Sequence, residues 1–331
     1  MNVWRPVLLC LLCLLCLLAA PARAEPAAQP PCAQADPVPW RALAPGVWVW
    51  EGANQEVSRF NGGHVAPTSL VVDGNEALVI DPGPGLLHGL RVRASVACRF
   101  QATVVGVVNT HAHAENVLAN AAFADRSVAA NAGTREAMVA RCPDCLASLT
   151  ERAGAEAMAG TTIVWPQRVL SDGDLISVGR LQLQVLGTEQ GHTASDLVLW
   201  LPEQRVLWVG GLAYEGRLPE LAQGSVLQWL QALDRLQQRR PRWVVGSRVG
   251  DARMREATRH YLQALHDRVL AAMDAGRHAG ELQSVQMDEW AGWSGFRSRQ
   301  GFNTQRAWRE LEPVWMDRGP APSGSLEQVG R

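Results

Sequence analysis

The chain has 331 residues, of which 47% are hydrophobic and 19% are charged, and its formal net charge at pH 7 is −1. This composition predicts a globular protein with room for an α/β domain, and a nearly neutral chain has no field that would attract nucleic acid or anionic lipid. All 31 basic residues are arginine. Their identity excludes chemistry that requires a lysine amine, such as Schiff-base catalysis or a P-loop.

Residues 1–24 have the pattern of a secretory signal peptide. Arg5 precedes a short apolar core at residues 7–18, and Ala22-Arg23-Ala24 fits a small-residue cleavage site. The alternative is a membrane anchor, but the core is shorter than the ~20 residues that a span requires. We therefore expect export to the periplasm, with no membrane insertion after signal cleavage. Residues 25–39, rich in Ala, Pro and Gln, are expected to form a flexible leader.

Cleavage would leave four cysteines: Cys32, Cys98, Cys142 and Cys145. Four cysteines in an exported chain predict at least one disulfide, with three possible connectivities. The pair in Cys142-Pro-Asp-Cys145 has the spacing of a redox motif, but no thioredoxin-like pattern surrounds it, and no second pair would complete a zinc site. We favour a structural bridge for this pair.

The first half of the chain alternates strands with helices. A loop carries Asn61-Gly-Gly-His64, and an Asp73-Gly-Asn turn predicts a hairpin between two of the strands. The expected strands are 47–50, 69–73, 77–80 and 103–109, and the expected helices are 86–96 and 116–123.

The second half repeats this alternation. Helices are expected at 134–141 and 145–158, joined by the Cys-Pro-Asp-Cys turn, and then at 227–238, 254–273 and 294–315. Strands are expected at 169–170, 181–186, 196–201, 206–209 and 243–245. Two runs of strands interleaved with helices predict an α/β fold of two packed sheets with helices outside. We assign residues 40–315 to this domain with its C-terminal helices, and residues 316–331 to a loose tail.

Three histidines follow two of these strands. His111 and His113 come directly after the Val-rich strand at 103–109, and residues i and i+2 of an extended segment face the same side. His192 follows the strand at 181–186. Three neutral imidazoles would hold one Zn²⁺ with an open fourth position, and such a site makes hydroxide available near neutral pH. The alternative is that these are ordinary loop histidines.

The loop after residue 109 resembles the metal-binding loop of the metallo-β-lactamase-fold hydrolases, whose usual pattern is Thr-His-x-His-x-Asp-His. The resemblance runs from about residue 47 to 248 and includes Asp81-Pro-Gly83, Gly191-His192-Thr193 and the strand at 206–212. It implies the four-layer αββα sandwich of that fold. Within the superfamily the chain is most similar to the exported quinoprotein relay system zinc metallohydrolases, on the phrases at 217–221, 229–233 and 303–312.

The chain departs from the family pattern at the second metal site. Glu115-Asn116 stands where the family has Asp-His, Gly211 replaces the metal-bridging aspartate, and Arg248 replaces the last histidine. The three-histidine half of the site therefore remains, and we expect one zinc ion bound by His111, His113 and His192. Arg248 could supply a positive charge where the second metal is lost, held by Glu115. Alternatively, Arg248 is a solvated loop residue.

Two functional hypotheses follow. The first is an exported mononuclear zinc hydrolase that attacks a small ester, lactam or related carbonyl substrate with zinc-bound hydroxide, linked to a quinoprotein dehydrogenase system. In that reading Glu115 and Arg248 are catalytic, and Arg248, His64 and Asn116 contact the substrate. The second is a binding or accessory protein of the same system, with quinoprotein dehydrogenase components as partners, that kept the fold but lost turnover. The sequence does not name the substrate.

Overall fold

The computed structural model describes residue 32, residues 37–281, residue 283 and residues 285–317. The predicted signal peptide at 1–24, most of the leader and the tail from residue 318 lie outside the described residues. None of the helices in the described part is both long enough and apolar enough to cross a membrane.

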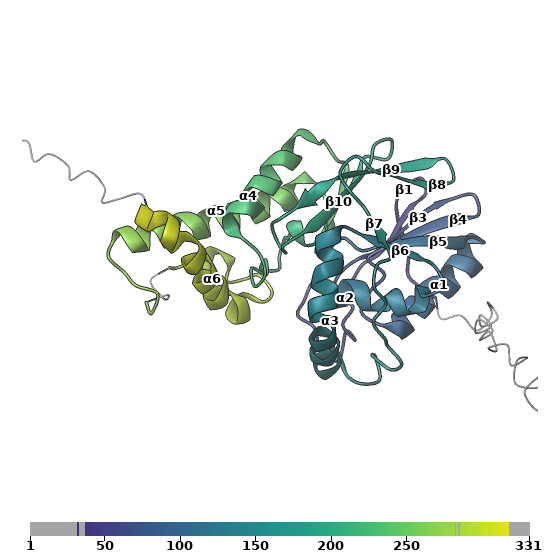
Figure 1. The fold of residues 1–331 in the computed structure, drawn as a ribbon, viewed down its shortest axis with the longest axis horizontal. Helices are drawn as coiled ribbons and strands as arrows, with labels where there is room; N and C mark the ends of the chain where they lie inside the picture. Colours follow the sequence, from purple (N-terminus) through teal and green to yellow (C-terminus); the bar gives the residue numbers. More distant parts are fainter. Residues whose placement is uncertain (1–31, 33–36, 282, 284, 318–331) are drawn as a thin grey trace, which may run out of the picture.

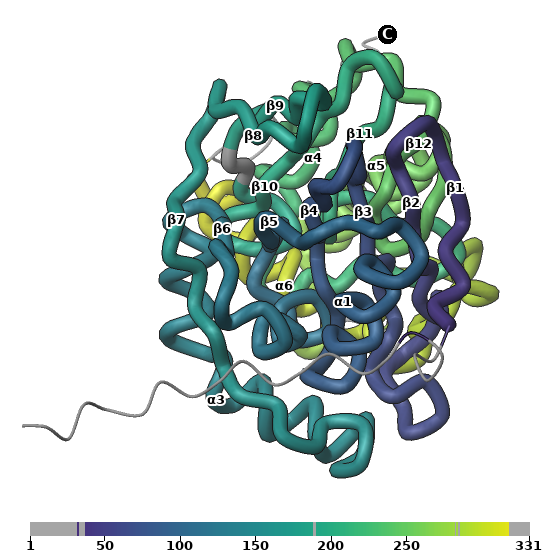
Figure 2. The backbone as a smooth tube through the Cα atoms, turned by 90° about the vertical axis from the view of Figure 1, so that its right-hand side faces the viewer, coloured from purple at the N-terminus to yellow at the C-terminus, as the bar shows by residue number. Residues whose placement is uncertain are grey.

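The first sheet has seven strands in the order β1-β2-β3-β4-β5-β6-β7, which Figure 2 shows from β7 at the left to β1 at the right. Neighbours from β1 to β4 are antiparallel, and those from β4 to β7 are parallel. Asp73 pairs with Glu76 in the predicted hairpin, which is confirmed. The strands are β1 Arg41–Ala44, β2 Val47–Trp50, β3 Thr68–Asp73, β4 Glu76–Ile80, β5 Thr103–Val108, β6 Ser127–Ala130 and β7 Arg168–Val169.

The second sheet has six strands in the order β13-β12-β11-β10-β9-β8. The β11 and β12 strands are parallel, and the other neighbours are antiparallel. The strands are β8 Leu175–Val178, β9 Leu181–Glu189, β10 Asp196–Leu201, β11 Val206–Trp208, β12 Trp243–Val245 and β13 Val249–Gly250.

Alternation along the strands explains why the two sheets stack. In β4, Leu78 and Ile80 pack between the sheets, whereas Val79 packs on the other face with Val92 of the first helix. Successive residues of a strand point to opposite faces, so a strand that is apolar throughout must be covered on both sides. Helices accordingly cover the outer face of each sheet, and the predicted αββα sandwich is confirmed.

The helices divide between the two outer faces. In Figure 1, α1, α2 and α3 lie with the first sheet, and α4, α5 and α6 gather at the opposite end of the molecule. The α-helices are α1 Leu86–Phe100, α2 Ala114–Val117, α3 Ala132–Ala153, α4 Val226–Arg235, α5 Ala252–Asp274 and α6 Phe296–Asp317. Short 3₁₀ turns are η2 Leu118–Phe123, η3 Gly210–Leu212, η4 Leu236–Gln238 and η6 Asp288–Trp290.

Two expectations about the Cys-Pro-Asp-Cys segment are wrong. It does not separate two helices, because α3 continues through Pro143. Cys142 and Cys145 are both free thiols, so this pair forms no structural bridge. The expectation of at least one disulfide is confirmed by the Cys32–Cys98 bond, which ties the leader to α1 with Cα atoms 5.4 Å apart.

Candidate metal centre

The turn after β5 brings His111 and His113 to one side of the chain. The buried strand ends at Val108, and the Asn109 amide still bonds to the Ala129 carbonyl of β6, which fixes the start of the turn. His113 is then the N-cap residue of α2, with an extended backbone at φ −79° and ψ 137°. The helix cannot begin earlier without drawing His113 away from His111.

His192 enters from the second sheet. It lies in the turn between β9 and β10, where the Asp196 carboxylate accepts hydrogen bonds from the Thr193 amide at 3.0 Å and the Thr193 hydroxyl at 2.8 Å. The amide of Leu197 donates to the carbonyl of Thr110 at 2.7 Å. This bond links the two histidine-bearing turns, so their relative position follows from backbone pairing.

The three imidazoles converge on one point. One nitrogen from each of His111, His113 and His192 lies within 4.8 Å of the others, and all three residues are buried. The closest pair is His192 Nε2 and His113 Nδ1, at 3.2 Å. Three lone pairs with this convergence can occupy three of the four positions around a tetrahedral metal ion.

The ring nitrogens of His111 and His192 that point away from the centre form hydrogen bonds with protein groups. His111 Nδ1 lies 2.9 Å from Thr110 Oγ1, and that hydroxyl donates its own proton to the Asp81 carboxylate at 2.6 Å. The hydroxyl must therefore accept from His111 Nδ1–H, which leaves Nε2 of His111 as the inward acceptor. His192 Nδ1 lies 3.0 Å from the Glu220 carbonyl, which likewise directs its Nε2 inward.

Burial keeps the imidazoles of His111 and His192 neutral. It lowers the pKa of His111 and of His192 well below the usual value of 6.5, and the neighbouring His113 lowers both further. Burial also raises the pKa of Asp81 to about 7, against the hydrogen bonds that it accepts from Thr110 and Asn116. His111 and His192 are thus neutral imidazoles with inward lone pairs and partnered outer nitrogens, and with the nearby His113 they form a ligand set that fits zinc.

The four positions that depart from the family pattern, 115, 116, 211 and 248, each make different contacts. A Cβ atom on Gly211 would lie 1.9 Å from Cδ2 of His192, so the ring takes the space of a side chain at this position. The Asn116 side chain bonds to Asp81, and Asn116 also lines the small pocket that holds His111 and His113. Glu115 lies 3.8 Å from His113 Nδ1. Arg248 pairs with Glu215 at 3.3 Å, in place of the pairing with Glu115 that the sequence predicted.

A cavity of about 310 Å³ opens beside the triad. His113 and Glu115 form its inner wall, and a smaller pocket that holds His111, His113 and Gly211 shares both residues with it. The polar face of α3 forms the outer wall, with Arg141, Asp144, Cys145, Ser148 and Arg152.

Sequence reasoning missed Glu220 and Arg299, which line the larger cavity, and it also missed Arg217. Arg217 is only 4% exposed and lines both cavities. Its Nη1 donates to the Val65 carbonyl at 3.1 Å, but its buried Nε has no hydrogen-bond partner among the described residues and lies 3.9 Å from the Glu56 carboxylate. The sequence offers one signal, an arginine six residues after Gly211 on the segment that leaves the same strand end.

His64 does not lie among the residues that form these two cavities. Its ring packs 4.4 Å from the Trp50 ring centroid and 4.5 Å from that of His88. Burial lowers the pKa of His64 to about 4, so its imidazole is neutral at physiological pH. These contacts give His64 a place in the core beside the site.

Comparison with known proteins places this geometry in a family. The family described as the Metallo-beta-lactamase superfamily matches residues 61–248. A metallo-beta-lactamase type 2 of Bacillus sp. (strain 170) is 25% identical over 201 residues, covering 60% of this chain and 70% of the relative. A metallo-beta-lactamase from Pontibacter korlensis has a TM-score of 0.55 at 21% identity, and covers 68% of this chain and 98% of its own. One from Hirschia baltica has a TM-score of 0.53 at 15% identity, with 68% and 97% covered.

Proposed function

The chain belongs to the metallo-beta-lactamase superfamily of hydrolases, and from this we propose that it is a mononuclear zinc hydrolase of small, negatively charged carbonyl compounds. The substrate class is an ester, a lactam or a related carbonyl. One observation carries the proposal: three buried imidazoles converge within 4.8 Å, and the outward nitrogens of His111 and His192 are held by protein groups.

The residues of the triad and Glu115 have different roles in the proposed reaction. A zinc ion held by His111, His113 and His192 would supply a Lewis acid that activates water near neutral pH. Glu115 faces both cavities beside His113, where its carboxylate can accept a proton from an attacking water. The neutral state of the His111 and His192 imidazoles keeps their lone pairs free for the ion.

The geometry favours a single ion. Gly211 replaces the aspartate that would bridge two metals, and the His192 ring occupies the position of its Cβ. Asn116 is engaged with Asp81, and Arg248 is engaged with Glu215. Among the described residues, Glu115 is then the one carboxylate that lines the small pocket with His111 and His113, which is too few ligands for a second zinc.

Arg217 supports the choice of an anionic substrate. Arg217 is a buried guanidinium that lies 3.9 Å from the Glu56 carboxylate, and its Nε has no hydrogen-bond partner among the described residues. A substrate carboxylate, or the oxyanion that develops during attack on the carbonyl, would complete its hydrogen bonding. We assign to Arg217 the role that the sequence suggested for Arg248.

We also propose that the protein is exported and works in an oxidising compartment such as the periplasm. The Cys32–Cys98 disulfide supports this, because disulfides persist in oxidising compartments. The link to a quinoprotein dehydrogenase system stays a proposal that rests on the sequence phrases at 217–221, 229–233 and 303–312.

The second candidate function is an accessory protein that binds its ligand without turnover. The replacement of four ligand-type positions, 115, 116, 211 and 248, favours it. Both candidates bind a small molecule at the same cavity. Hydrolysis is the property that separates them.

The test combines metal analysis with a substrate screen. The full chain should hold close to one equivalent of zinc, and His192→Ala should lose it, whereas the exposed His278→Ala should not. Chromogenic esters and lactams with and without a carboxylate should be turned over by the parent and not by His192→Ala. Binding of zinc without any turnover would favour the accessory role, and absence of zinc binding would reject the proposed function.

A further inference from the structure

The segment between Ala213 and Ser225 holds the outer nitrogen of His192, yet it has little regular structure of its own. It contains one isolated bridge, between Arg217 and Ser294, and no helix or strand. Its Glu220 carbonyl nevertheless accepts the bond from His192 Nδ1 at 3.0 Å. A carbonyl in an irregular segment can orient an imidazole only if other elements hold that segment in place.

Helix α6 holds this segment at Glu220 and at Ser225. Arg299, Asn303 and Glu310 are separated by four and seven residues, so they lie on one face of the helix. Figure 1 shows α6 packed beside α5 at the end of the molecule away from α1. Residues of both helices lie beyond residue 248, where the match to the family ends.

Asn303 holds the peptides on both sides of Glu220. Its Nδ2 donates to the Pro219 carbonyl at 2.8 Å, and its Oδ1 accepts from the Leu221 amide at 3.1 Å. The same Nδ2 also donates to the Tyr261 hydroxyl of α5 at 2.8 Å, and Asn303 is 1% exposed. A buried amide with these three bonds has one orientation, so the position of Glu220 follows from it.

Arg299 holds the side chain of the same residue. Its Nη1 donates to Glu220 Oε2 at 2.6 Å, and its Nε and Nη2 each donate to Glu56 at 2.9 Å. The guanidinium therefore ties Glu220 to the loop that precedes β3. Such bidentate, charge-assisted bonds are among the strongest in proteins.

Glu310 holds the end of the segment and the helix that follows. Its carboxylate accepts bonds from the Ser225 hydroxyl at 2.6 Å and the Val226 amide at 2.8 Å, at the N-terminus of α4. That helix carries Trp229, whose ring packs 5.2 Å from the His192 ring. The charge also suits a helix N-terminus, where free amides and the helix dipole attract anions.

We propose that α6 is a positioning element of the metal centre, and that Arg299 and Asn303 set the affinity for zinc by fixing the Glu220 carbonyl against His192. The proposal rests on the proposed zinc site. Asn303 acts through Glu220, whereas Arg299 holds the Glu220 side chain and also lines the cavity beside His113. Loss of such an outer partner typically weakens metal binding by about 10–100-fold.

The experiment measures zinc affinity of the full chain by competition with a chromogenic chelator. Arg299→Gln and Asn303→Ala should each weaken zinc binding at least tenfold, and the visible spectrum of the Co²⁺-loaded protein should shift because the His192 ring is less constrained. Arg299→Lys should recover part of the affinity, since an ammonium can still pair with Glu220 but cannot form the fork to Glu56. Having two separate positions guards against one variant that fails to fold.

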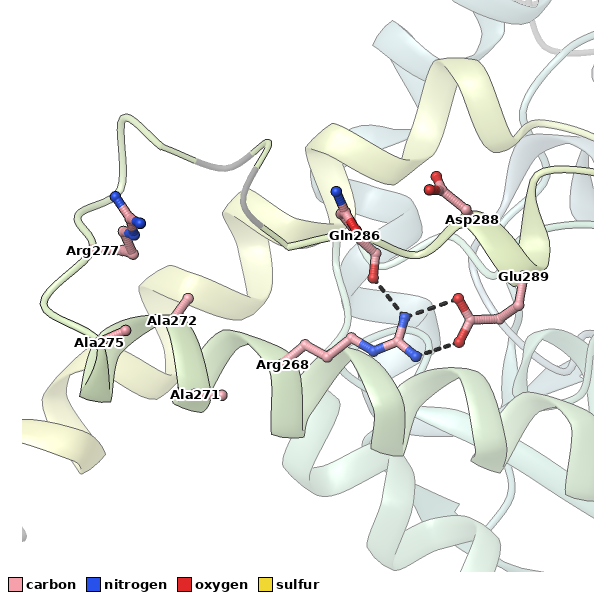
Figure 3. Close-up of a pocket in the computed structure, with 8 residues that line it drawn as sticks. All are labelled: Arg268, Ala271, Ala272, Ala275, Arg277, Gln286, Asp288 and Glu289. Carbon is pink, nitrogen blue, oxygen red and sulfur yellow. Dashed lines mark hydrogen bonds and ion pairs between the residues drawn. The ribbon is translucent and has the colours of Figure 1, made fainter.

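Two control variants separate positioning from general stability. Arg268 makes a comparable forked ion pair with Glu289, at a cavity that α5 lines together with Gln286 and Asp288 (Figure 3). Leu311 is a fully buried core residue of α6 itself. Arg268→Gln and Leu311→Ala should lower the melting temperature but leave the zinc affinity and the Co²⁺ spectrum unchanged.

The outcomes are distinguishable. If Leu311→Ala weakens zinc binding as much as Arg299→Gln does, α6 is a structural support only and the inference is overturned. Unchanged affinity in both Arg299→Gln and Asn303→Ala also overturns it, while leaving the proposed function intact. A parent protein that binds no zinc would overturn the proposed function and this inference with it.

Discussion

At position 211 the absence of a side chain determines whether the third histidine can reach the metal centre. A Cβ atom there would lie 1.9 Å from His192 Cδ2, far inside van der Waals contact, and 2.5 Å from Nε2. Gly211→Ala should therefore displace the imidazole and weaken zinc binding by an order of magnitude or more. Chelator competition measures this, and Gly292→Ala is the matched control because a Cβ there meets no atom within 4 Å. Equal zinc affinity in Gly211→Ala and the parent would contradict the geometry.

Substitution of Arg217 should weaken the binding of anionic ligands, whereas substitution of Arg248 should not. Mercaptoacetate can place its thiolate on zinc and its carboxylate on a nearby arginine. Arg217→Lys should weaken its binding by about 1.5–3 kcal/mol, the scale of a charge-assisted hydrogen bond, because an ammonium lacks the fork. Arg248→Ala should leave the affinity unchanged, since Arg248 pairs with Glu215.

Titration calorimetry with mercaptoethanol supplies the control for this prediction. It carries the same thiol without a carboxylate, so both variants should bind it as the parent does. A loss of mercaptoacetate affinity in Arg248→Ala, with Arg217→Lys unaffected, would return the anion-binding role to Arg248.

His64 makes the fold sensitive to acid. Burial lowers its pKa from 6.5 to about 4 in the folded protein. As the pH falls from 6.5 towards 4, the His64 imidazole is protonated in the unfolded chain before it is protonated in the folded protein. The unfolded state is stabilised by this proton, so the folded protein loses stability over this range. Between pH 6.5 and 4, the free energy of unfolding of His64→Gln should therefore fall by on the order of 2–3 kcal/mol less than that of the parent. Urea unfolding at several pH values measures this difference. His278, which is exposed, gives the control: His278→Gln should keep the parental pH profile.

At the level of elements, the Cys32–Cys98 disulfide closes the longest covalent loop in the described chain, with 66 residues of separation. Loop-closure entropy for that length corresponds to roughly 4 kcal/mol, and measured disulfides usually contribute 2–4 kcal/mol. Cys98→Ser should lower the free energy of unfolding by about that amount in urea titrations. Cys145→Ser, which removes a free thiol, should change it far less. Similar losses in both variants would show that the tie between leader and α1 adds nothing.

The course of α3 shows where local sequence signals fail. Proline removes a backbone donor and usually ends or kinks a helix, so a boundary at Pro143 was a reasonable prediction. The buried face of Met138, Cys142, Leu149 and Ala153 continues across the proline, and burial of that face outweighs the lost bond. The cysteines share that helix, where Cys142 is packed in the core rather than bridged.

Every strand that the sequence missed is short, although β2, β11 and β12, of three or four residues, were predicted from their unbroken runs of apolar and aromatic residues. The predicted strands at 47–50, 69–73, 77–80 and 196–201 match β2, β3, β4 and β10 within a residue. The missed strands are β1, β6, β8 and β13, each of two to four residues. A run that short carries too few alternations to show a period, and only pairing with a neighbour defines it.

At the scale of the whole molecule, the histidine triad was predictable because strand ends and His-x-His spacing are local signals. The residues that hold the triad in place were not predictable from the sequence. Glu220, Arg299 and Asn303 belong to an irregular segment and to a helix 79 or more residues further on, and no local pattern connects them. The burial of Arg217 is likewise a tertiary property, created where the 213–225 segment crosses the loop that carries Val65.

A zinc ion bound by the three histidines would link the two halves of the sandwich. His111 and His113 follow β5 of the first sheet, whereas His192 follows β9 of the second, so a bound ion must hold both sheets together. Zinc at a thousand times its dissociation constant should raise the free energy of unfolding by about 4 kcal/mol, measured in urea against chelator-treated protein. Mg²⁺ should have no such effect, because it prefers oxygen ligands. His192→Ala should unfold at the same urea concentration with and without zinc; an equal rise in that variant would place the stabilising ion somewhere other than between the sheets.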